Sequence, residues 1–277
     1  MKIITQKNIV LQNPETKPFL ADAFYPETSE KLPLVIFSHG YKGYKDWGAW
    51  NLMAEKFAKA GFYFVKFNFS HNGTTLENPT EFADLESFGK NNYSKELSDL
   101  EFTIEHFSKN EKVNPENITL IGHSRGGGIS IIKASENPKI KNLITLASVD
   151  SLDRFPRNEH FEKWKKEGVF FSMNGRTKQN MPHYFQFFED FQKNKERFSV
   201  ENSAGNFAGN FLIIHGKEDE AVNFSSAKNL HQWNKNSELQ SIENGNHTFG
   251  AKEPLESSEL PTDLEKAVVK MISFLKN

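Results

Sequence analysis

Residues 118–128 constrain the fold of this 277-residue chain more than any other stretch. The apolar run 118–121 is typical of a buried strand, and helix-forming residues follow from Ile129. Between them lies Ser124, with Gly122 and Gly126 two positions away on either side. This spacing allows a serine to occupy a strained turn between a strand and a helix. The short pattern also arises by chance in glycine-rich turns, and its strand and helix context favours a functional turn.

Strand-like and helix-like segments alternate along most of the chain. Apolar runs typical of buried strands occur at residues 34–38, 62–67, 118–121, 143–147 and 211–214. Helical spacing of apolar residues occurs at residues 47–60, 94–107, 225–233 and 263–275. This alternation predicts an α/β fold with a mostly parallel central sheet flanked by helices. Residues 2–11 and 19–25 are expected to form an antiparallel edge, and 239–242 a short late strand.

The alternation breaks between residues 151 and 208, where aromatic and basic residues are interleaved and no buried strand is visible. We interpret residues 1–277 as a single domain in which 151–208 is an inserted cap over one edge of the sheet. Most of its aromatic side chains are expected to pack the insertion onto the body. We expect Phe171, Phe185 and Phe188 to bind substrate.

The composition sets limits on the kind of partner. A formal net charge of -2 gives no bias toward nucleic acid or anionic membranes, so a small molecule is the expected partner. The absence of cysteine excludes thiolate catalysis and disulfide scaffolds. No secretion signal or membrane-spanning run is recognisable, which predicts a cytoplasmic protein. Nothing in the sequence indicates an oligomeric state.

Three loops that follow late strands each carry one residue of a complementary type. They are Ser124, Asp219 and His247, in this chain order. The carboxyl ends of strands in an open α/β sheet form a common ligand-binding edge. A serine hydroxyl needs a base to accept its proton, and a carboxylate orients the histidine that acts as this base. The three residues therefore predict a nucleophilic site.

The order serine, acid, histidine resembles the α/β-hydrolase family. The resemblance covers residues 34–275 and rests on His39-Gly40-Tyr41, Gly122-His123-Ser124-Arg125-Gly126, His215-Gly216-Lys217-Glu218-Asp219 and Gly245-Asn246-His247. Within the family the chain is most similar to small bacterial serine esterases of the dienelactone hydrolase-like and cinnamoyl esterase-like group. It has serine where dienelactone hydrolases have cysteine, so lactone specificity is not implied.

The resemblance also implies an oxyanion hole and the chemistry around it. The backbone N–H groups of Tyr41 and Arg125 would stabilise the oxyanion, and Gly40 beside them is expected to bind substrate. The Arg125 side chain either binds a substrate carboxylate or pairs with an acidic neighbour, and the pairing is favoured. His71 either lines the pocket or belongs to an ordinary loop. No metal and no organic cofactor is expected.

Other residues compete for two of the catalytic roles. Asp150, Glu218 and Glu220 are alternatives for the acid, and the spacing after His215-Gly216 favours Asp219. Alternatives for the base are His71, His123, His183 and His215, of which none combines the order and loop of His247.

The expected function is hydrolysis of a small soluble acyl or aryl carboxylic ester through an acyl-enzyme. A serine peptidase or amidase is an alternative because its acylation chemistry is the same. A prolyl-oligopeptidase-like enzyme would normally carry a large propeller domain, and no propeller is expected from these 277 residues. A non-catalytic binding protein on a hydrolase scaffold is a third hypothesis, because fold does not determine function.

Overall fold

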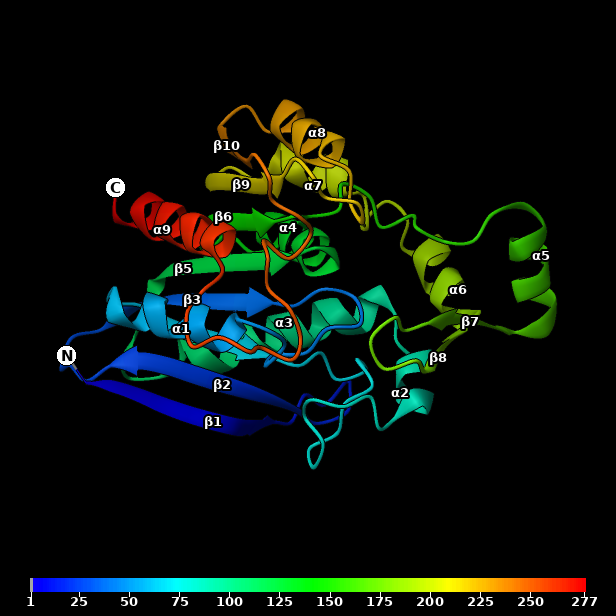
Figure 1. The fold of residues 1–277 in the computed structure, drawn as a ribbon, viewed down its shortest axis with the longest axis horizontal. Coiled ribbons are helices and arrows are strands. Elements are labelled where there is room, and N and C mark those ends of the chain that lie inside the picture. Colours follow the sequence, from blue (N-terminus) through cyan, green and yellow to red (C-terminus); the bar gives the residue numbers. More distant parts are fainter. Residues whose placement is uncertain (1) are drawn as a thin grey trace.

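The computed structural model describes residues 2–277 and is organised around an eight-stranded sheet (Figure 1). The strands, in their order across the sheet, are β1 (Ile3–Leu11), β2 (Phe19–Pro26), β4 (Tyr63–Phe67), β3 (Leu32–Ser38), β5 (Val113–His123), β6 (Ile140–Leu146), β9 (Asn210–Gly216) and β10 (Ser237–Ile242). The pairs β1–β2 and β2–β4 are antiparallel, and all other pairs are parallel. The expected α/β class with a mostly parallel sheet is confirmed.

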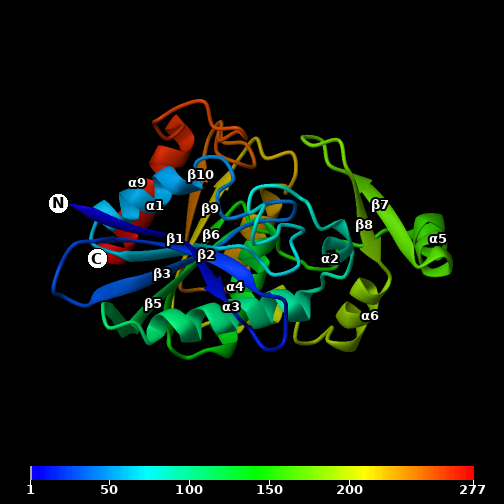
Figure 2. The same cartoon turned by 90° about the horizontal axis from the view of Figure 1, so that it is seen from below.

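Helices cover both faces of this sheet (Figure 2). One face is covered by α1 (Trp50–Lys59) and α9 (Thr262–Lys276), and the other by α3 (Tyr93–Ser108), α4 (Arg125–Glu136) and α8 (Ser225–Trp233). The strands read as apolar runs because their side chains are buried on both faces; β3 and β4 are examples. Among residues 2–277, no helix is long and apolar enough to cross a bilayer.

Two local expectations need correction. The helix predicted over residues 47–60 begins only at Trp50, because residues 44–49 form turns that lead out of the loop after β3. The sequence pattern predicts no element between residues 67 and 94, but the structure has a short helix there, α2 (Leu85–Gly89). The side chain of Asp84 accepts a hydrogen bond from the backbone N–H of Ser87, and so caps the start of this helix.

Residues 151–208 follow β6 and lead to β9 by way of α5 (Asn158–Glu167), β7 (Val169–Met173), β8 (Asn180–Tyr184), α6 (Gln186–Lys193) and α7 (Val200–Asn206). This stretch, in which no buried strand was visible, contains the antiparallel pair β7–β8. Neither strand is a continuous apolar run, and β8 contains Asn, Pro and His, so no strand pattern was visible. Helix α5 and this hairpin project from the body beyond the carboxyl ends of the parallel strands (Figure 1).

Candidate active site

Ser124 occupies a strained turn between β5 and α4. Its backbone has φ 55° and ψ -120°, which a non-glycine residue seldom adopts. The turn is tight because glycines surround it. A Cβ on Gly122 would lie 2.3 Å from the carbonyl oxygen of Gly126, and one on Gly126 would lie 2.4 Å from that of His39. Both positions therefore require glycine for close packing of backbone, as the spacing in the sequence indicated.

The structure brings Ser124, His247 and Asp219 into one hydrogen-bonded row. His247 Nε2 lies 3.0 Å from Ser124 Oγ, and His247 Nδ1 lies 2.8 Å from Asp219 Oδ2. With Nδ1–H donating to the carboxylate, Nε2 carries a lone pair that can accept the serine proton. The loops after β9 and β10 supply the acid and the histidine, each beyond the carboxyl end of a parallel strand.

Several donors hold the carboxylate of Asp219 in its charged form. Its Oδ1 accepts backbone N–H bonds from Ala221 at 2.9 Å and Val222 at 2.8 Å. Burial, the largest influence, raises the pKa of Asp219, but hydrogen bonds from His215, His247 and Val222 together hold it well below the usual value. The carboxylate stays ionised at neutral pH, as is required to stabilise an imidazolium at His247.

The competing acids lie elsewhere. Asp150 accepts hydrogen bonds from Ser226 Oγ at 3.0 Å and Asn229 Nδ2 at 2.7 Å, on helix α8. Glu218 and Glu220 are exposed on the surface. Of the four candidate acids, only Asp219 contacts His247.

Three other histidines hold the site loops in place. His39 Nδ1 donates to the carbonyl oxygen of Gly40 at 2.8 Å, and His123 Nε2 donates to that of His247 at 2.9 Å. His215 Nε2 donates to the carbonyl oxygen of Val222 at 2.8 Å. Burial lowers the pKa to about 4 for His39 and to about 3 for His123, so both rings are neutral at neutral pH.

Two backbone N–H groups beside Ser124 are free to donate. Among residues 2–277, neither Tyr41 nor Arg125 uses its backbone N–H in a hydrogen bond within the protein. The loop that carries Tyr41 lies directly against the serine, because a Cβ on Gly40 would be only 2.9 Å from the Cβ of Ser124. The pair of donors is therefore available to a group bound at the serine.

A buried network of four charges fixes the loop after β3, and the sequence analysis missed it. Lys66 and Asp22 are completely buried on neighbouring strands, with Lys66 Nζ 2.6 Å from Asp22 Oδ2 and 2.5 Å from Asp46 Oδ1. Lys45 Nζ contacts the same two carboxylates. The signal in the sequence was a charged residue inside each of two apolar strand runs, at Asp22 and Lys66.

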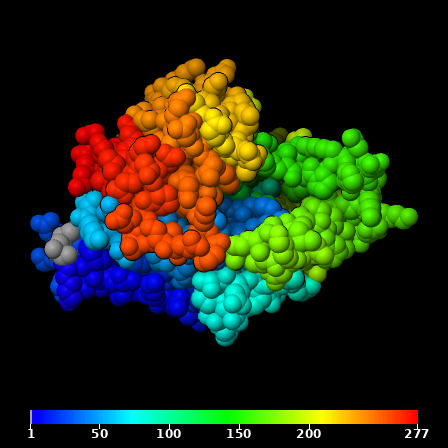
Figure 3. Space-filling model, in the orientation of Figure 1, coloured from blue at the N-terminus to red at the C-terminus, as the bar shows by residue number. Residues whose placement is uncertain are grey.

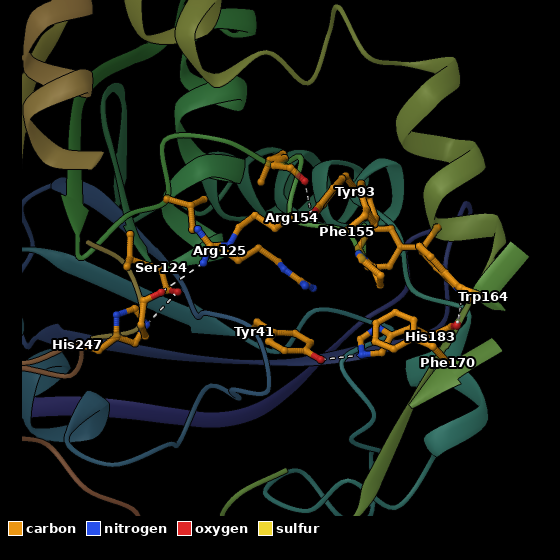
Figure 4. Close-up of a pocket in the computed structure, with 16 residues that line it drawn as sticks. Tyr41, Tyr93, Ser124, Arg125, Arg154, Phe155, Trp164, Phe170, His183 and His247 are labelled. Atoms are coloured by element: carbon orange, nitrogen blue, oxygen red, sulfur yellow. Dashed lines mark hydrogen bonds between the residues drawn. The ribbon is translucent and has the colours of Figure 1, made fainter. Parts of the chain in front are cut away.

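A cavity of about 410 Å³ opens from the serine toward the insertion. Ser124 and His247 lie at one end of it and Trp164, Phe170 and His183 at the other (Figure 4). The space-filling view shows a hollow between the insertion and the C-terminal part of the chain (Figure 3). A smaller cavity of about 170 Å³ meets Ser124 on its other side; it is lined by Gly40, Tyr41, Trp47, Trp50 and Thr248 among others.

The structure does not bring all the predicted substrate-binding residues to the larger cavity. Phe171 points out of the β7–β8 hairpin and is 60% exposed, while its neighbour Phe170 lines the cavity. Phe185 and Phe188 lie outside the lining and contact Trp164, with ring centroids 5.2 and 6.3 Å away. The aromatic residues that line the cavity are Tyr41, Tyr93, Phe155, Trp164, Phe170 and Phe187.

His71 also lies away from both cavities at the serine. It is buried, and its Nδ1 lies 2.7 Å from the hydroxyl of Ser70. Burial lowers its pKa to about 4. These contacts fit the second of the two alternatives from the sequence, an ordinary residue of the loop after β4.

The Tyr41 side chain links its loop to the insertion. Its hydroxyl lies 2.8 Å from Ser172 Oγ on β7 and 2.7 Å from His183 Nε2 on β8. Burial lowers the pKa of His183 to about 3, so the ring is neutral in this contact. One residue thus presents a backbone donor to the serine and a side chain to the wall of the cavity.

A serine held in a strained turn at the end of a central parallel strand, in this sheet topology, places the chain among the α/β-hydrolases. The model of the prolyl oligopeptidase family matches residues 52–260, which include Ser124, Asp219, His247 and the whole insertion. The chain belongs to that family.

Other known proteins resemble parts or all of the chain. The quorum-quenching protein AidA of Acinetobacter baumannii (strain MDR-ZJ06) is 22% identical over 122 residues. That match covers 44% of this chain and 37% of AidA, so the chain spans little more than a third of the length of this curated relative.

Two solved structures superimpose over nearly the full length. Est1E from Butyrivibrio proteoclasticus, with bound ferulic acid, gives a TM-score of 0.75 at 19% identity and covers 97% of this chain and 98% of Est1E. A putative dienelactone hydrolase from Klebsiella pneumoniae subsp. pneumoniae MGH 78578 gives 0.66 at 12% identity, with both chains covered completely. The expected resemblance to esterases and dienelactone hydrolase-like proteins is confirmed at the level of the fold.

Proposed function

We propose that this protein hydrolyses carboxylic esters through an acyl-enzyme formed on Ser124. His247 accepts the serine proton as Oγ attacks the ester carbonyl, and Asp219 orients the imidazole and stabilises its charge. The backbone N–H groups of Tyr41 and Arg125 stabilise the oxyanion. His247 then protonates the leaving alcohol, and a water molecule, activated by the same histidine, releases the acid.

The observation that carries the proposal is the row of hydrogen bonds from Asp219 through His247 to Ser124, at 2.8 and 3.0 Å. The geometry is that of a base already within proton-transfer distance of its nucleophile. A carboxylate held in its charged form and two free backbone donors support the same chemistry.

The cavities favour a small ester with a larger acyl half. We assign the acyl group to the 410 Å³ cavity, whose lining includes six aromatic side chains, and the alcohol to the smaller cavity. Est1E, a protein of similar structure, has been solved with bound ferulic acid, which is an aromatic acid. We further propose that residues 151–208 act as a cap, since Phe155, Trp164 and Phe170 supply part of the wall. A cytoplasmic location stays a prediction from the sequence.

Hydrolysis of 4-nitrophenyl acetate by the purified chain tests this function. We expect activity in the wild type and its loss, by about 10³-fold or more, in Ser124→Ala. The matched control is Ser151→Ala, an exposed serine on the loop after β6, which should retain wild-type activity. Equal rates in wild type and Ser124→Ala would refute the proposal.

A peptidase or amidase is the second candidate, and membership of the prolyl oligopeptidase family favours it. Amide cleavage uses the same acylation step but demands better protonation of the leaving amine. Matched ester and anilide substrates with one acyl group separate the two functions. An esterase shows a much higher kcat/KM for the ester with negligible anilide cleavage, whereas comparable values identify an amidase.

A further inference from the structure

Two arginines line the larger cavity, and its wall contains no carboxylate. They are Arg125, directly after the serine, and Arg154, on the loop that leads into the insertion. The other lining residues include no lysine, aspartate or glutamate, and burial lowers the pKa of the lining His183 to about 3. The chain as a whole has a formal net charge of -2, whereas this cavity wall is positively charged.

The protein uses only part of the hydrogen-bonding capacity of the Arg125 side chain. Its Nη1 lies 3.5 Å from Glu96 Oε1, which is a long contact, and Asn91 already donates to that oxygen at 2.7 Å. A guanidinium has five N–H donors, and within residues 2–277 the Arg125 side chain makes only this one hydrogen bond. The side chain is nevertheless only 18% exposed.

The orientation of Arg125 leaves its donors available to a ligand. Its guanidinium lies over the ring of Tyr41 at 4.3 Å and near the rings of Tyr93 and Phe187 at 5.6 and 5.4 Å. Stacking covers the faces of the guanidinium, whereas its N–H groups lie in the plane and remain free at the edges. Figure 4 shows Arg125 between the serine and the aromatic end of the cavity.

Arg154, unlike Arg125, has no carboxylate partner among residues 2–277. Its Nη2 donates to the carbonyl oxygen of Ala221 at 3.2 Å, and no carboxylate of residues 2–277 lies within 4.0 Å of it. The nearby Arg157 is also exposed, but it pairs with Asp153 at 2.8 Å and does not line the cavity. The cavity therefore contains an excess of positive charge with unused donors, which is the chemistry that binds a carboxylate.

We propose that Arg125 and Arg154 select esters whose acyl part ends in a carboxylate, such as the monoester of a dicarboxylic acid. The acyl chain extends from Ser124 into the larger cavity, and its terminal carboxylate meets the free edge of the Arg125 guanidinium. Glu96 and Tyr41 hold that guanidinium in place. This inference rests on the proposed esterase function and names its substrate class.

The test compares 4-nitrophenyl hydrogen adipate with 4-nitrophenyl hexanoate, which differ by a carboxylate in place of a terminal methyl group. For the wild type we expect kcat/KM to be about tenfold or more higher for the adipate ester. The ratio should fall about tenfold in Arg125→Met and by a smaller factor in Arg154→Gln. It should remain unchanged in Arg157→Gln, a matched control that removes a surface charge from the same segment.

Each outcome has a defined meaning. A wild type that hydrolyses hexanoate at least as well as adipate, or a ratio that neither substitution lowers, overturns the selection of anions and leaves the esterase function intact. If Arg125→Met does not fold, Arg154→Gln and the wild-type ratio decide. If neither ester is hydrolysed, the esterase function fails, and calorimetric titration with adipate decides: binding that Arg154→Gln weakens supports the anion site, and absence of binding overturns it.

Discussion

Ser124 shows how one residue can combine strain with chemistry. Its backbone, at φ 55°, is stable only because the glycines around it allow backbone groups to approach closely. That strain lifts the side chain out of the strand and toward His247, at 3.0 Å. The position of a carboxylate decides whether it can act as the catalytic acid. Asp150 and Asp219 both follow sheet strands, but only Asp219 contacts the imidazole of His247.

The difference between the two aspartates can be measured directly. Asp219→Asn should lower kcat for 4-nitrophenyl acetate by about 10⁴-fold, because the amide can hold the wrong imidazole tautomer and cannot stabilise its charge. Asp150→Asn serves as the control and should keep wild-type kcat. If the Asp150 variant loses activity and the Asp219 variant keeps it, the catalytic acid is Asp150, and our assignment of Asp219 is wrong.

The close approach at Gly40 leads to a second prediction. In Gly40→Ala the new methyl group would lie 2.9 Å from the Cβ of Ser124, so the loop must move and carry the N–H of Tyr41 away from the oxyanion. We expect kcat to fall about 10²-fold with little change in KM. Gly175→Ala, where no atom lies within 4 Å of the added Cβ, should have wild-type kinetics. A wild-type kcat in Gly40→Ala would exclude this role for the loop.

At the scale of elements, the site depends on the loops after β3, β5, β9 and β10, with one further wall from the β7–β8 hairpin. The carboxyl ends of parallel strands bring these loops together, although they are far apart in the sequence. The hairpin is different, because it reaches the site through side-chain contacts. Tyr41 and Lys42 join it to the loop after β3, through Ser172, His183 and the carbonyl oxygen of Met173.

Removing the Tyr41 hydroxyl should loosen the hairpin. In Tyr41→Phe we expect faster amide hydrogen exchange in β7 and β8, because Ser172 and His183 lose a part-buried hydrogen-bond partner. Tyr184→Phe removes a hydrogen bond between the hairpin and Glu86 at an exposed position, and should have a smaller effect. Exchange in β7 and β8 that is unchanged in Tyr41→Phe would show that other contacts hold the hairpin.

The sequence predicted the site and the sheet better than the insertion, for physical reasons. Buried parallel strands appear as continuous apolar runs. Ser124, Asp219 and His247 follow strand segments in the order serine, acid, histidine, which is typical of α/β-hydrolases. Strands β7 and β8 lack an apolar run, so their alternation could not be seen, and Phe171 was expected in the pocket instead of Phe170. Asp22 and Lys66 pair only because β2 and β4 are neighbours in the sheet. In the sequence, each residue appears only as an isolated charge in an apolar run, with no sign of its partner.

At the scale of the whole molecule, folding buries some groups that water would otherwise stabilise. Asp99 on α3 is completely buried; its carboxylate accepts hydrogen bonds from Thr16 Oγ1 at 2.6 Å and from the backbone N–H of Ser70 at 2.8 Å. Burial raises its pKa to about 7, even though hydrogen bonds from these partners and Asn13 lower it. This group makes the stability of the fold depend on pH.

Because the pKa of Asp99 is raised in the folded state, the free energy of unfolding should decrease as the pH rises. Between its ordinary pKa of 3.8 and about 7, the folded protein holds a proton that the unfolded chain has released. The free energy of unfolding therefore decreases from about pH 4 to about pH 7 through this residue. Urea unfolding of Asp99→Asn should show a weaker decrease over that range. The control Glu111→Gln, at an exposed position, should behave as the wild type; identical pH profiles for all three proteins would contradict the prediction.

The central claim is that Ser124 is a nucleophile activated by His247. A fluorophosphonate probe reacts covalently with an activated serine, and peptide mass spectrometry locates the modified residue. We predict one labelled site, Ser124, in the folded wild type, with labelling lost in Ser124→Ala and strongly slowed in His247→Ala. A folded wild-type protein that the probe leaves unlabelled, or labels at another serine, would contradict the account.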